Sequence, residues 1–180
     1  MSDKNDVRKA VKERIAALAS EQKASMSGAI AERFTISPEY ARAHSIFFYF
    51  STSDEPDTKG LIGRALAEGK DVYLPRIEGD KMVLVSYREG ATMQVNRYGI
   101  EEPTGQASAV SPDLAVIPLV AFDRDKHRLG RGKGYYDRFL TGYAGESVAL
   151  AFSAQECPQV PTEYFDVSPK VIVTEREVIR

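Results

Sequence analysis

The sequence predicts an α/β fold in which helices cover both faces of a mostly parallel sheet. Short apolar segments alternate along the chain with segments of helical periodicity, which is the pattern of strands joined by crossover helices. Two apolar segments, 114–118 and 148–152, show no polar alternation, which is typical of central strands buried on both faces. The chain has 180 residues, 43% hydrophobic and 28% charged, a composition that is typical of one globular domain. We therefore expect a single domain, residues 1–180, with a three-layer, Rossmann-like architecture.

The first half of the chain is expected to begin with two helices. Val7, Val11 and Ile15 recur at helical spacing, and a break near Ser20 divides the segment 3–34. The further elements expected before residue 90 are a helix starting at Ser37-Pro38-Glu39, a strand at 45–51, a helix from Asp57-Thr58 to about residue 68, a strand at 71–75 ended by its proline, and a strand at 82–87.

The second half is expected to contain a long loop, three strands and one short helix. Residues 90–112 hold Gly, Pro, Ser and Thr throughout with little periodicity, so we predict a functional loop there. Strands are expected at 114–118, 148–152 and 171–174, and a helix at 135–140. Because ligands of such sheets bind at the carboxyl ends of the strands, the segment after 114–118 is the expected site.

Composition argues against several classes of protein. Cys157 is the only cysteine, so an internal disulfide and a cysteine-based zinc cluster are excluded. The apolar runs are too short to cross a bilayer and the first residues lack a signal-peptide core, so we expect a cytoplasmic protein without a membrane partner. The net charge is −2, yet 124–133 carries five basic residues and one acidic residue, which leaves −6 on the rest. This focused positive charge is typical of an anion site rather than of a nucleic-acid-binding face.

The segment 128–137 reads Arg-Leu-Gly-Arg-Gly-Lys-Gly-Tyr-Tyr-Asp and carries the chemistry. Its glycines allow backbone N–H groups to converge on one point, and its cations add charge, so it is expected to cradle phosphate. It fits neither the P-loop nor the dinucleotide-binding pattern. No hydroxyl follows Lys133 to hold Mg²⁺, so a carboxylate must, and Asp137 lies one helical turn further on. The alternative from spacing alone is a solvated basic turn, although two adjacent tyrosines favour a ligand.

This segment resembles the signature of the 5-formyltetrahydrofolate cyclo-ligases (methenyltetrahydrofolate synthetases), which is Ala-Phe-Asp, a gap, and Arg-Leu-Gly-x-Gly-Lys-Gly-Tyr-Tyr-Asp. Every fixed position is present between Ala121 and Asp137. Two positions depart from the family pattern, because Pro56 falls inside a Glu-x-x-Thr motif and Leu119-Val120 replaces a usual glycine. The other matching motifs, which extend over nearly the whole chain, are Lys4 with Arg8, Glu55 with Thr58, Leu74-Pro75-Arg76, Asn96 with Gly99-Ile100-x-Glu102-Pro103, and Gln155, Pro161 and Asp166.

The resemblance implies an ATP- and Mg²⁺-dependent ring closure of 5-formyltetrahydrofolate. The formyl oxygen would attack the γ-phosphate to give an N5-iminium phosphate, and N10 would then add to the activated carbon. Loss of phosphate would give 5,10-methenyltetrahydrofolate, with ADP as the other product. Because the substrate supplies both nucleophiles, the protein needs only to position the reactants and stabilise charge. The implied partners are the folate, including polyglutamylated forms, and ATP; a monomer without a nucleic-acid partner is expected.

The resemblance also implies a role for each matching residue. Asp137 would hold Mg²⁺, with Asp166 as a weaker second ligand. Glu55 would bind the folate near N5 and N10, and Phe50 and Met93 are candidate walls for the pterin. The residues implied to bind ATP are Lys4, Arg8, Arg128, Gly130, Arg131, Gly132, Lys133, Gly134, Tyr135 and Tyr136; those from Arg131 to Tyr135 would also contact the folate, and Arg131, Lys133 and Tyr135 would act in catalysis.

Two other functional classes stay open at this point. The basic-aromatic loop suits a nucleotide- or RNA-binding module, which would bind single strands in a salt-sensitive way without turnover. The charge of −6 outside the loop argues against that class. A phosphosugar isomerase or acyl-CoA transferase on a similar sheet would need neither Mg²⁺ nor ATP.

Overall fold

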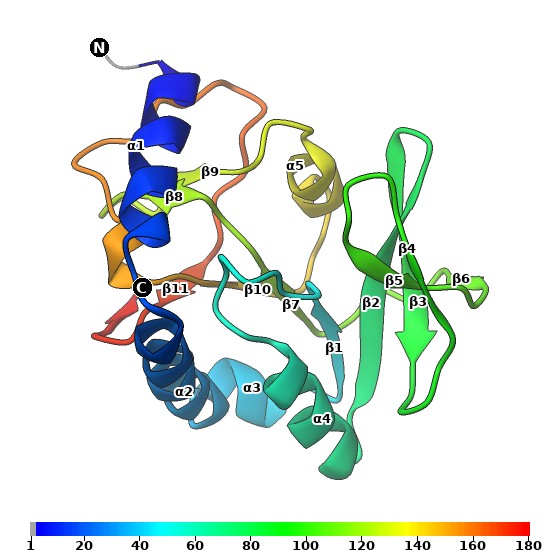
Figure 1. Ribbon diagram of the computed structural model, residues 1–180. Coiled ribbons are helices and arrows are strands. Elements are labelled where there is room, and N and C mark those ends of the chain that lie inside the picture. Colours follow the sequence, from blue (N-terminus) through cyan, green and yellow to red (C-terminus); the bar gives the residue numbers. More distant parts are fainter. Residues whose placement is uncertain (1–2) are drawn as a thin grey trace.

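The computed structural model describes residues 3–180 and is built around one eight-stranded sheet (Figure 1). The strands of this sheet are β1 (Ser45–Phe48), β2 (Asp71–Glu78), β3 (Lys81–Tyr87), β6 (Ala107–Ser108), β7 (Leu114–Ile117), β10 (Glu146–Leu150), β11 (Val171–Val173) and β12 (Val178–Ile179). Their order is β12-β11-β10-β7-β1-β2-β3-β6. The five strands from β11 to β2 are parallel, and β12, β3 and β6 pair antiparallel at the two sides. The predicted mostly parallel sheet is confirmed.

The helices agree closely with the predicted positions. They are α1 (Lys4–Ala16), α2 (Ser20–Thr35), α3 (Pro38–Arg42), α4 (Lys59–Ala67) and α5 (Tyr135–Leu140), with a 3₁₀ turn η1 (Ser153–Gln155). Asp3 caps α1 by accepting hydrogen bonds from two backbone N–H groups of the first turn. Ser37 caps α3, whose first residue is Pro38, as the sequence predicts. None of the helices in the described part of the chain is long and apolar enough to span a membrane.

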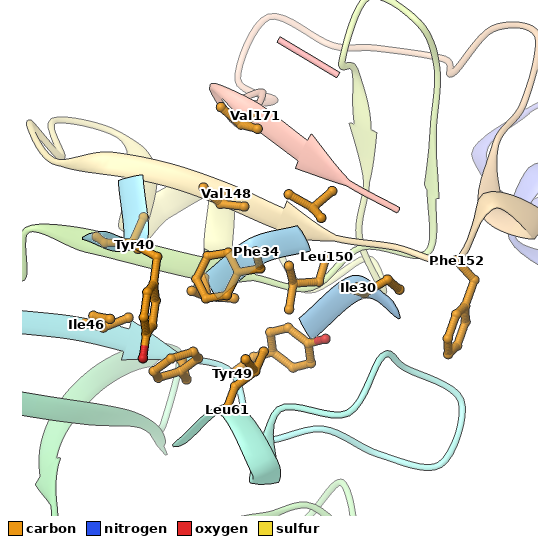
Figure 2. Packing of buried hydrophobic residues seen from close by; sticks show 14 of the residues in the cluster. Ile30, Phe34, Tyr40, Ile46, Tyr49, Leu61, Val148, Leu150, Phe152 and Val171 are labelled. Atoms are coloured by element: carbon orange, nitrogen blue, oxygen red, sulfur yellow. The ribbon is translucent and has the colours of Figure 1, made fainter. Parts of the chain in front are cut away.

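Helices cover both faces of the sheet, but unequally. One face packs against α1, α2, α3 and α4, and Figure 2 shows Phe34 and Tyr40 from these helices among the side chains of this core. On the other face the helical cover is the short α5, whose Phe139 lies with its ring 5.0 Å from that of Phe47. Because successive side chains of a strand alternate between faces, Ile46 joins the first core and Phe47 the second.

The strand predicted to end at Pro75 runs on past it. Proline lacks an N–H, so it fits a strand only where that group has no ladder partner. The pairing of β1 with β2 ends at Tyr73, so beyond it β2 pairs only with β3. The N–H of Ile77, which lies on the same side as the nitrogen of Pro75, binds the side chain of Glu102 at 3.0 Å instead of β3. The proline nitrogen therefore faces away from the β3 ladder.

The predicted loop at 90–112 is partly structured. It contains the hairpin formed by β4 (Met93–Val95) and β5 (Glu101–Pro103), and also β6, the edge strand. Glu102 in β5 is only 3% exposed, and it accepts hydrogen bonds from Asn96 and Gln94. One buried carboxylate thus fixes the turn at 96–99. These strands and β12 are too short to give a periodic signal in the sequence.

A second hairpin, formed by β8 (Ala121–Phe122) and β9 (Arg128–Leu129), follows β7 and carries the start of the basic loop. Since β1 and β7 are parallel neighbours, the segments that leave their carboxyl ends emerge at one edge of the sheet. Figure 1 shows α1 beside this hairpin. The fold therefore brings α1, the segment after β1 and the basic loop together.

Candidate active site

A cavity of about 680 Å³ lies at this edge of the sheet. Met93, one of the two candidate pterin walls, packs instead against the core of the first face. All the other residues to which the sequence assigned a role line the cavity: Lys4, Arg8, Phe50, Glu55, Arg128, Gly130, Arg131, Gly132, Lys133, Gly134, Tyr135, Tyr136, Asp137 and Asp166. Residues up to 162 positions apart in the chain therefore meet at one site.

The basic loop packs against α1 through Arg8. Arg8 Nε donates to the carbonyl oxygen of Gly130 at 2.8 Å. Gly132 has a φ of +96°, and a Cβ atom added to it would lie 3.3 Å from Arg8 Nη2. Gly134, with a φ of +69°, precedes α5. These two positions need glycine for their backbone conformation, and Gly132 also needs it for the close approach of the guanidinium.

Gly132→Ala is expected to destabilise the protein by about 1–2 kcal/mol and to weaken binding of the ATP that the family resemblance implies. The left-handed backbone accounts for that cost, and the new methyl group displaces Arg8. The melting temperature should fall by roughly 2–8 °C, and the KM for ATP should rise. Gly28→Ala is the control, because Gly28 lies inside α2 with no atom within 4 Å of an added Cβ. A Gly132→Ala protein with parental stability and parental KM would contradict this account of the loop.

Arg128 lies behind the loop rather than in the open part of the cavity. Its side chain is 2% exposed, and Nη2 donates to Asp137 Oδ1 at 2.5 Å. Asp137 Oδ1 also accepts from the N–H of Val167 at 3.0 Å. Arg128 Nε is buried and has no hydrogen-bond partner among residues 3–180. The sequence predicted that Arg128 would bind the phosphates of ATP. In the structure its guanidinium group contacts the carboxylate of Asp137.

Lys4 reaches the cavity from the first turn of α1 and meets two carboxylates. Its Nζ lies 2.6 Å from Asp166 Oδ2 and 2.6 Å from Glu163 Oε2. Partial burial opposes the charge, but hydrogen bonds from Nζ to Asp166 and Glu163 outweigh it and raise the pKa of Lys4. The ring of Phe165 lies 5.6 Å from the same ammonium group. The sequence predicted Lys4 as a phosphate ligand and Asp166 as a metal ligand. In the structure the two side chains contact each other.

Glu55 is bound by Arg131 and by a residue that the sequence did not single out. Glu55 Oε1 accepts from Arg131 Nη2 at 2.8 Å. Its other oxygen, Oε2, accepts from Thr52 N at 2.9 Å and from Thr52 Oγ1 at 3.1 Å. The segment after β1 therefore positions the carboxylate, which is 11% exposed, at the basic loop. No spacing rule would have identified Thr52, because its role depends on the shape of the turn.

The two adjacent tyrosines lie in different surroundings. Tyr135 Oη lies 3.1 Å from both Tyr98 Oη and Arg97 Nη2, and these hydrogen bonds lower the pKa of Tyr135. Tyr136 stacks on Phe47 with ring centroids 6.2 Å apart, and burial raises its pKa. The sequence did not single out Arg97 and Tyr98, which lie in the turn held by Glu102. The motif around Asn96 was the signal that could have identified them.

Lys133 is exposed and lines the cavity between Gly132 and Gly134. Within residues 3–180 its ammonium group contacts no carboxylate and forms no hydrogen bond. It differs in this from Lys4, Arg128 and Arg131, which all have carboxylate partners. A phosphate is the ligand that best suits a free ammonium group between two glycines.

The carboxylates of the cavity fit a Mg²⁺ ion that also binds phosphate oxygens. Mg²⁺ is usually held by one or two carboxylates together with substrate phosphates. Asp137 uses Oδ1 for its hydrogen bonds and Asp166 uses Oδ2, so each keeps one oxygen without a partner among residues 3–180. Asp123, Asp125 and His127 form a second group of side chains that could hold a metal ion. Asp123, however, stabilises its own loop by accepting hydrogen bonds from the N–H groups of Asp125, His127 and Val160.

Comparison with known proteins gives a consistent result. The chain matches the model of the 5-formyltetrahydrofolate cyclo-ligase family over residues 1–175. A 5-formyltetrahydrofolate cyclo-ligase of Escherichia coli (strain K12) is 32% identical over 178 residues, which cover 93% of this chain and 98% of that protein. One of Haemophilus influenzae is 37% identical over 139 residues, covering 72% and 74%.

Two solved structures have the same fold as this chain. The NMR structure of Aquifex aeolicus 5,10-methenyltetrahydrofolate synthetase superposes with a TM-score of 0.87 at 32% identity, covering 98% of this chain and 92% of that one. A 5,10-methenyltetrahydrofolate synthetase from Mycoplasma pneumoniae gives a TM-score of 0.75 at 23% identity, with coverage of 97% and 99%, which supports the fold.

Proposed function

The chain belongs to the 5-formyltetrahydrofolate cyclo-ligase family, and we propose that it converts 5-formyltetrahydrofolate to 5,10-methenyltetrahydrofolate with ATP and Mg²⁺. The observation that carries this proposal is the cavity in which the unpaired Lys133, the glycine loop and Glu55 lie together. The cavity holds an anion site and a site for an uncharged ring system side by side, because its lining also includes Phe50, Pro75 and Ile77. Phosphoryl transfer to a bound folate needs both.

The reaction we propose proceeds in two steps. The formyl oxygen attacks the γ-phosphorus, a new P–O bond forms, and the bond to ADP breaks, which leaves an N5-iminium phosphate. N10 then adds to the formyl carbon and loses its proton, and phosphate departs with the electron pair of the C–O bond. Lys133 and Arg131 stabilise the negative charge that moves between the phosphoryl oxygens, and the backbone N–H groups of the loop contribute to the same task.

Mg²⁺ would be held by Asp137 and Asp166 and would neutralise charge on the triphosphate. Arg8 fixes the loop against α1, and Lys4 orients Asp166. We further propose that Tyr135 contacts the substrates, and that Tyr136 and Phe50 supply aromatic walls.

Turnover is the direct test of this function. The protein is mixed with 5-formyltetrahydrofolate and MgATP, and the absorbance of the methenyl product is followed together with ADP release. We expect product and ADP in equal amounts, and none when ATP is omitted. A protein that binds single-stranded RNA without turnover, or that acts without ATP, would support one of the two other classes considered from the sequence.

Glu55→Gln is expected to raise the KM for the folate or lower kcat by roughly tenfold or more, since a hydrogen bond to a charged group contributes about 1.5–3 kcal/mol. The KM for ATP should stay close to parental, because a glutamine amide oxygen can still accept the hydrogen bond from Arg131 Nη2 and Lys133 is untouched. Asp54→Asn is the matched control: Asp54 is 60% exposed and pairs with Lys23 at the surface. A variant impaired mainly toward ATP would contradict the placement of Glu55 at the folate.

A further inference from the structure

Thr52 lies between two charged residues that the proposed function assigns to different substrates. Its hydroxyl oxygen accepts a hydrogen bond from Arg131 Nη2 at 3.0 Å. The same hydroxyl group donates to Glu55 Oε2 at 3.1 Å, and Arg131 Nη2 also donates directly to Glu55 Oε1 at 2.8 Å. The hydroxyl group of Thr52 therefore links the carboxylate proposed to bind the folate with a cation proposed to bind the phosphates.

Arg131 uses only one corner of its guanidinium group in these contacts. Both of the hydrogen bonds that it forms within residues 3–180 are donated by Nη2. A guanidinium group also carries N–H donors on Nε and Nη1, in a fixed planar arrangement. The side chain is 51% exposed and lines the cavity, so these donors are accessible to an anion bound in the glycine loop. Arg131 can therefore hold Glu55 and a phosphate oxygen at the same time.

The turn that carries Thr52 and Glu55 is held in place by the fold. Glu55 N donates to the carbonyl oxygen of Thr52 at 3.2 Å, and Thr52 N donates back to Glu55 Oε2 at 2.9 Å. Tyr49, which is 2% exposed, donates from Oη to the carbonyl oxygen of Pro56 at 2.6 Å. Arg131 is the most exposed of the three linked side chains, so it has the most conformational freedom to lose when a ligand binds.

We propose that Thr52 is a positioning residue that couples the binding of the two substrates. This inference rests on the proposed function. When ATP binds, its phosphates fix Arg131, and Arg131 together with Thr52 then holds the Glu55 carboxylate where the folate needs it. The folate binds more tightly as a result, because these side chains are already ordered. By thermodynamic linkage the folate increases the affinity for ATP by the same factor.

Calorimetry measures this coupling without turnover. The probes are 5-formyltetrahydrofolate and the Mg²⁺ complex of β,γ-imido-ATP, whose bridging nitrogen prevents transfer of the γ-phosphoryl group. The Kd for the folate is measured with and without saturating β,γ-imido-ATP, and the ratio of the two values is the coupling factor. We expect a factor of about ten or more in the parent protein. Thr52→Val removes the hydroxyl group but keeps the N–H that binds Glu55, and it should lower the factor by about threefold or more, the effect of one hydrogen bond.

Three further variants show whether the hydroxyl group is responsible. Thr52→Ser restores a hydroxyl group and should restore the coupling factor. Thr92→Val is the matched control, because it makes the same change at an exposed position outside the cavity lining, and it should keep the parental factor. Arg131→Lys leaves the turn at Thr52 intact but replaces the planar fork by one nitrogen, so it should lower the factor even if Thr52→Val does not fold.

The outcomes separate this inference from the proposed function. A parent protein that binds the two ligands independently would overturn the coupling but not the proposed function, since turnover requires only that both ligands bind. An unchanged factor in Thr52→Val or in Arg131→Lys would also overturn it, and so would a factor that Thr52→Ser does not restore. A parent protein that binds neither ligand would contradict the proposed function as well.

Discussion

Lys133→Ala is expected to melt like the parent protein and to lose about 10²–10³-fold in kcat/KM. Lys133 is exposed and lies between two glycines, so removing a surface side chain of this kind should change stability by less than about 0.5 kcal/mol. If its ammonium group meets the γ-phosphoryl oxygens as charge develops on them, its loss costs about 3–4 kcal/mol of transition-state stabilisation, by analogy with single-donor deletions in oxyanion sites. Thermal melting and steady-state kinetics on the same preparation measure both quantities.

Two further variants test this explanation of Lys133. Lys133→Arg should restore activity only in part, because a planar guanidinium does not replace a compact ammonium charge. Arg124→Ala should keep parental activity, since Arg124 belongs to the same basic segment but pairs with Glu156 and Glu177 outside the cavity. Parental activity in Lys133→Ala would show that the loop is a surface turn with no role in phosphate binding. A variant that unfolds would show instead that Lys133 supports the fold, which would also contradict this account.

The predictable part of the fold is the part whose physical signal is local. The apolar runs that become β1, β7 and β10 are buried on both faces, and that burial is visible in the sequence as a lack of alternation. The continuation of β2 past Pro75 was not visible, because it depends on where β1 stops pairing. The same holds for the β4–β5 hairpin, because Glu102 ties it to β2 by accepting from the N–H of Ile77 and also accepts from Gln94 within the hairpin.

The candidate site could be predicted as a set of residues but not as a set of contacts. The motifs identified the members, since each has an unusual composition in a fixed order. The pairing of Arg131 with Glu55 joins residues 76 positions apart, so no spacing rule could supply it. A second hollow beside the active-site cavity shows the same limit, because Lys81 and Arg97 of its lining have no signal of their own and only the packing of two turns brings them together.

These contacts also pair most of the charged side chains of the cavity with a group of opposite charge. Three cations are paired with carboxylates, which lowers the cost of holding charge in a partly buried site. Lys133 is left unpaired at the surface of the loop, where water solvates it until an anion binds. Under the proposed function, an incoming triphosphate would meet the free Lys133 together with cations that are already oriented, which would favour binding of phosphate in a defined position.

Asp137→Asn is expected to lower the free energy of unfolding by about 3 kcal/mol as well as to remove most Mg²⁺-dependent turnover. Asparagine is tolerated at the start of a helix, so helix propensity alone predicts no cost. The structure changes this expectation, because the carboxylate is the ion-pair partner of Arg128, whose side chain is 2% exposed. Removing one member of such a pair leaves an uncompensated buried charge. The melting temperature should fall by roughly 6–12 °C.

A double-mutant cycle separates the two roles of Asp137. Arg128→Met removes the buried cation, and the carboxylate, which is 18% exposed and still accepts from Val167 N, should tolerate this better. In the double variant no buried charge is left, so stability should recover by about 1–3 kcal/mol relative to additivity. This recovery of stability should not restore Mg²⁺ binding. In both variants that lack Asp137, MgADP should therefore stabilise the protein no more than ADP alone does. Additive stabilities would show that the ion pair contributes nothing, and MgADP stabilisation in Asp137→Asn would remove Asp137 from the metal site.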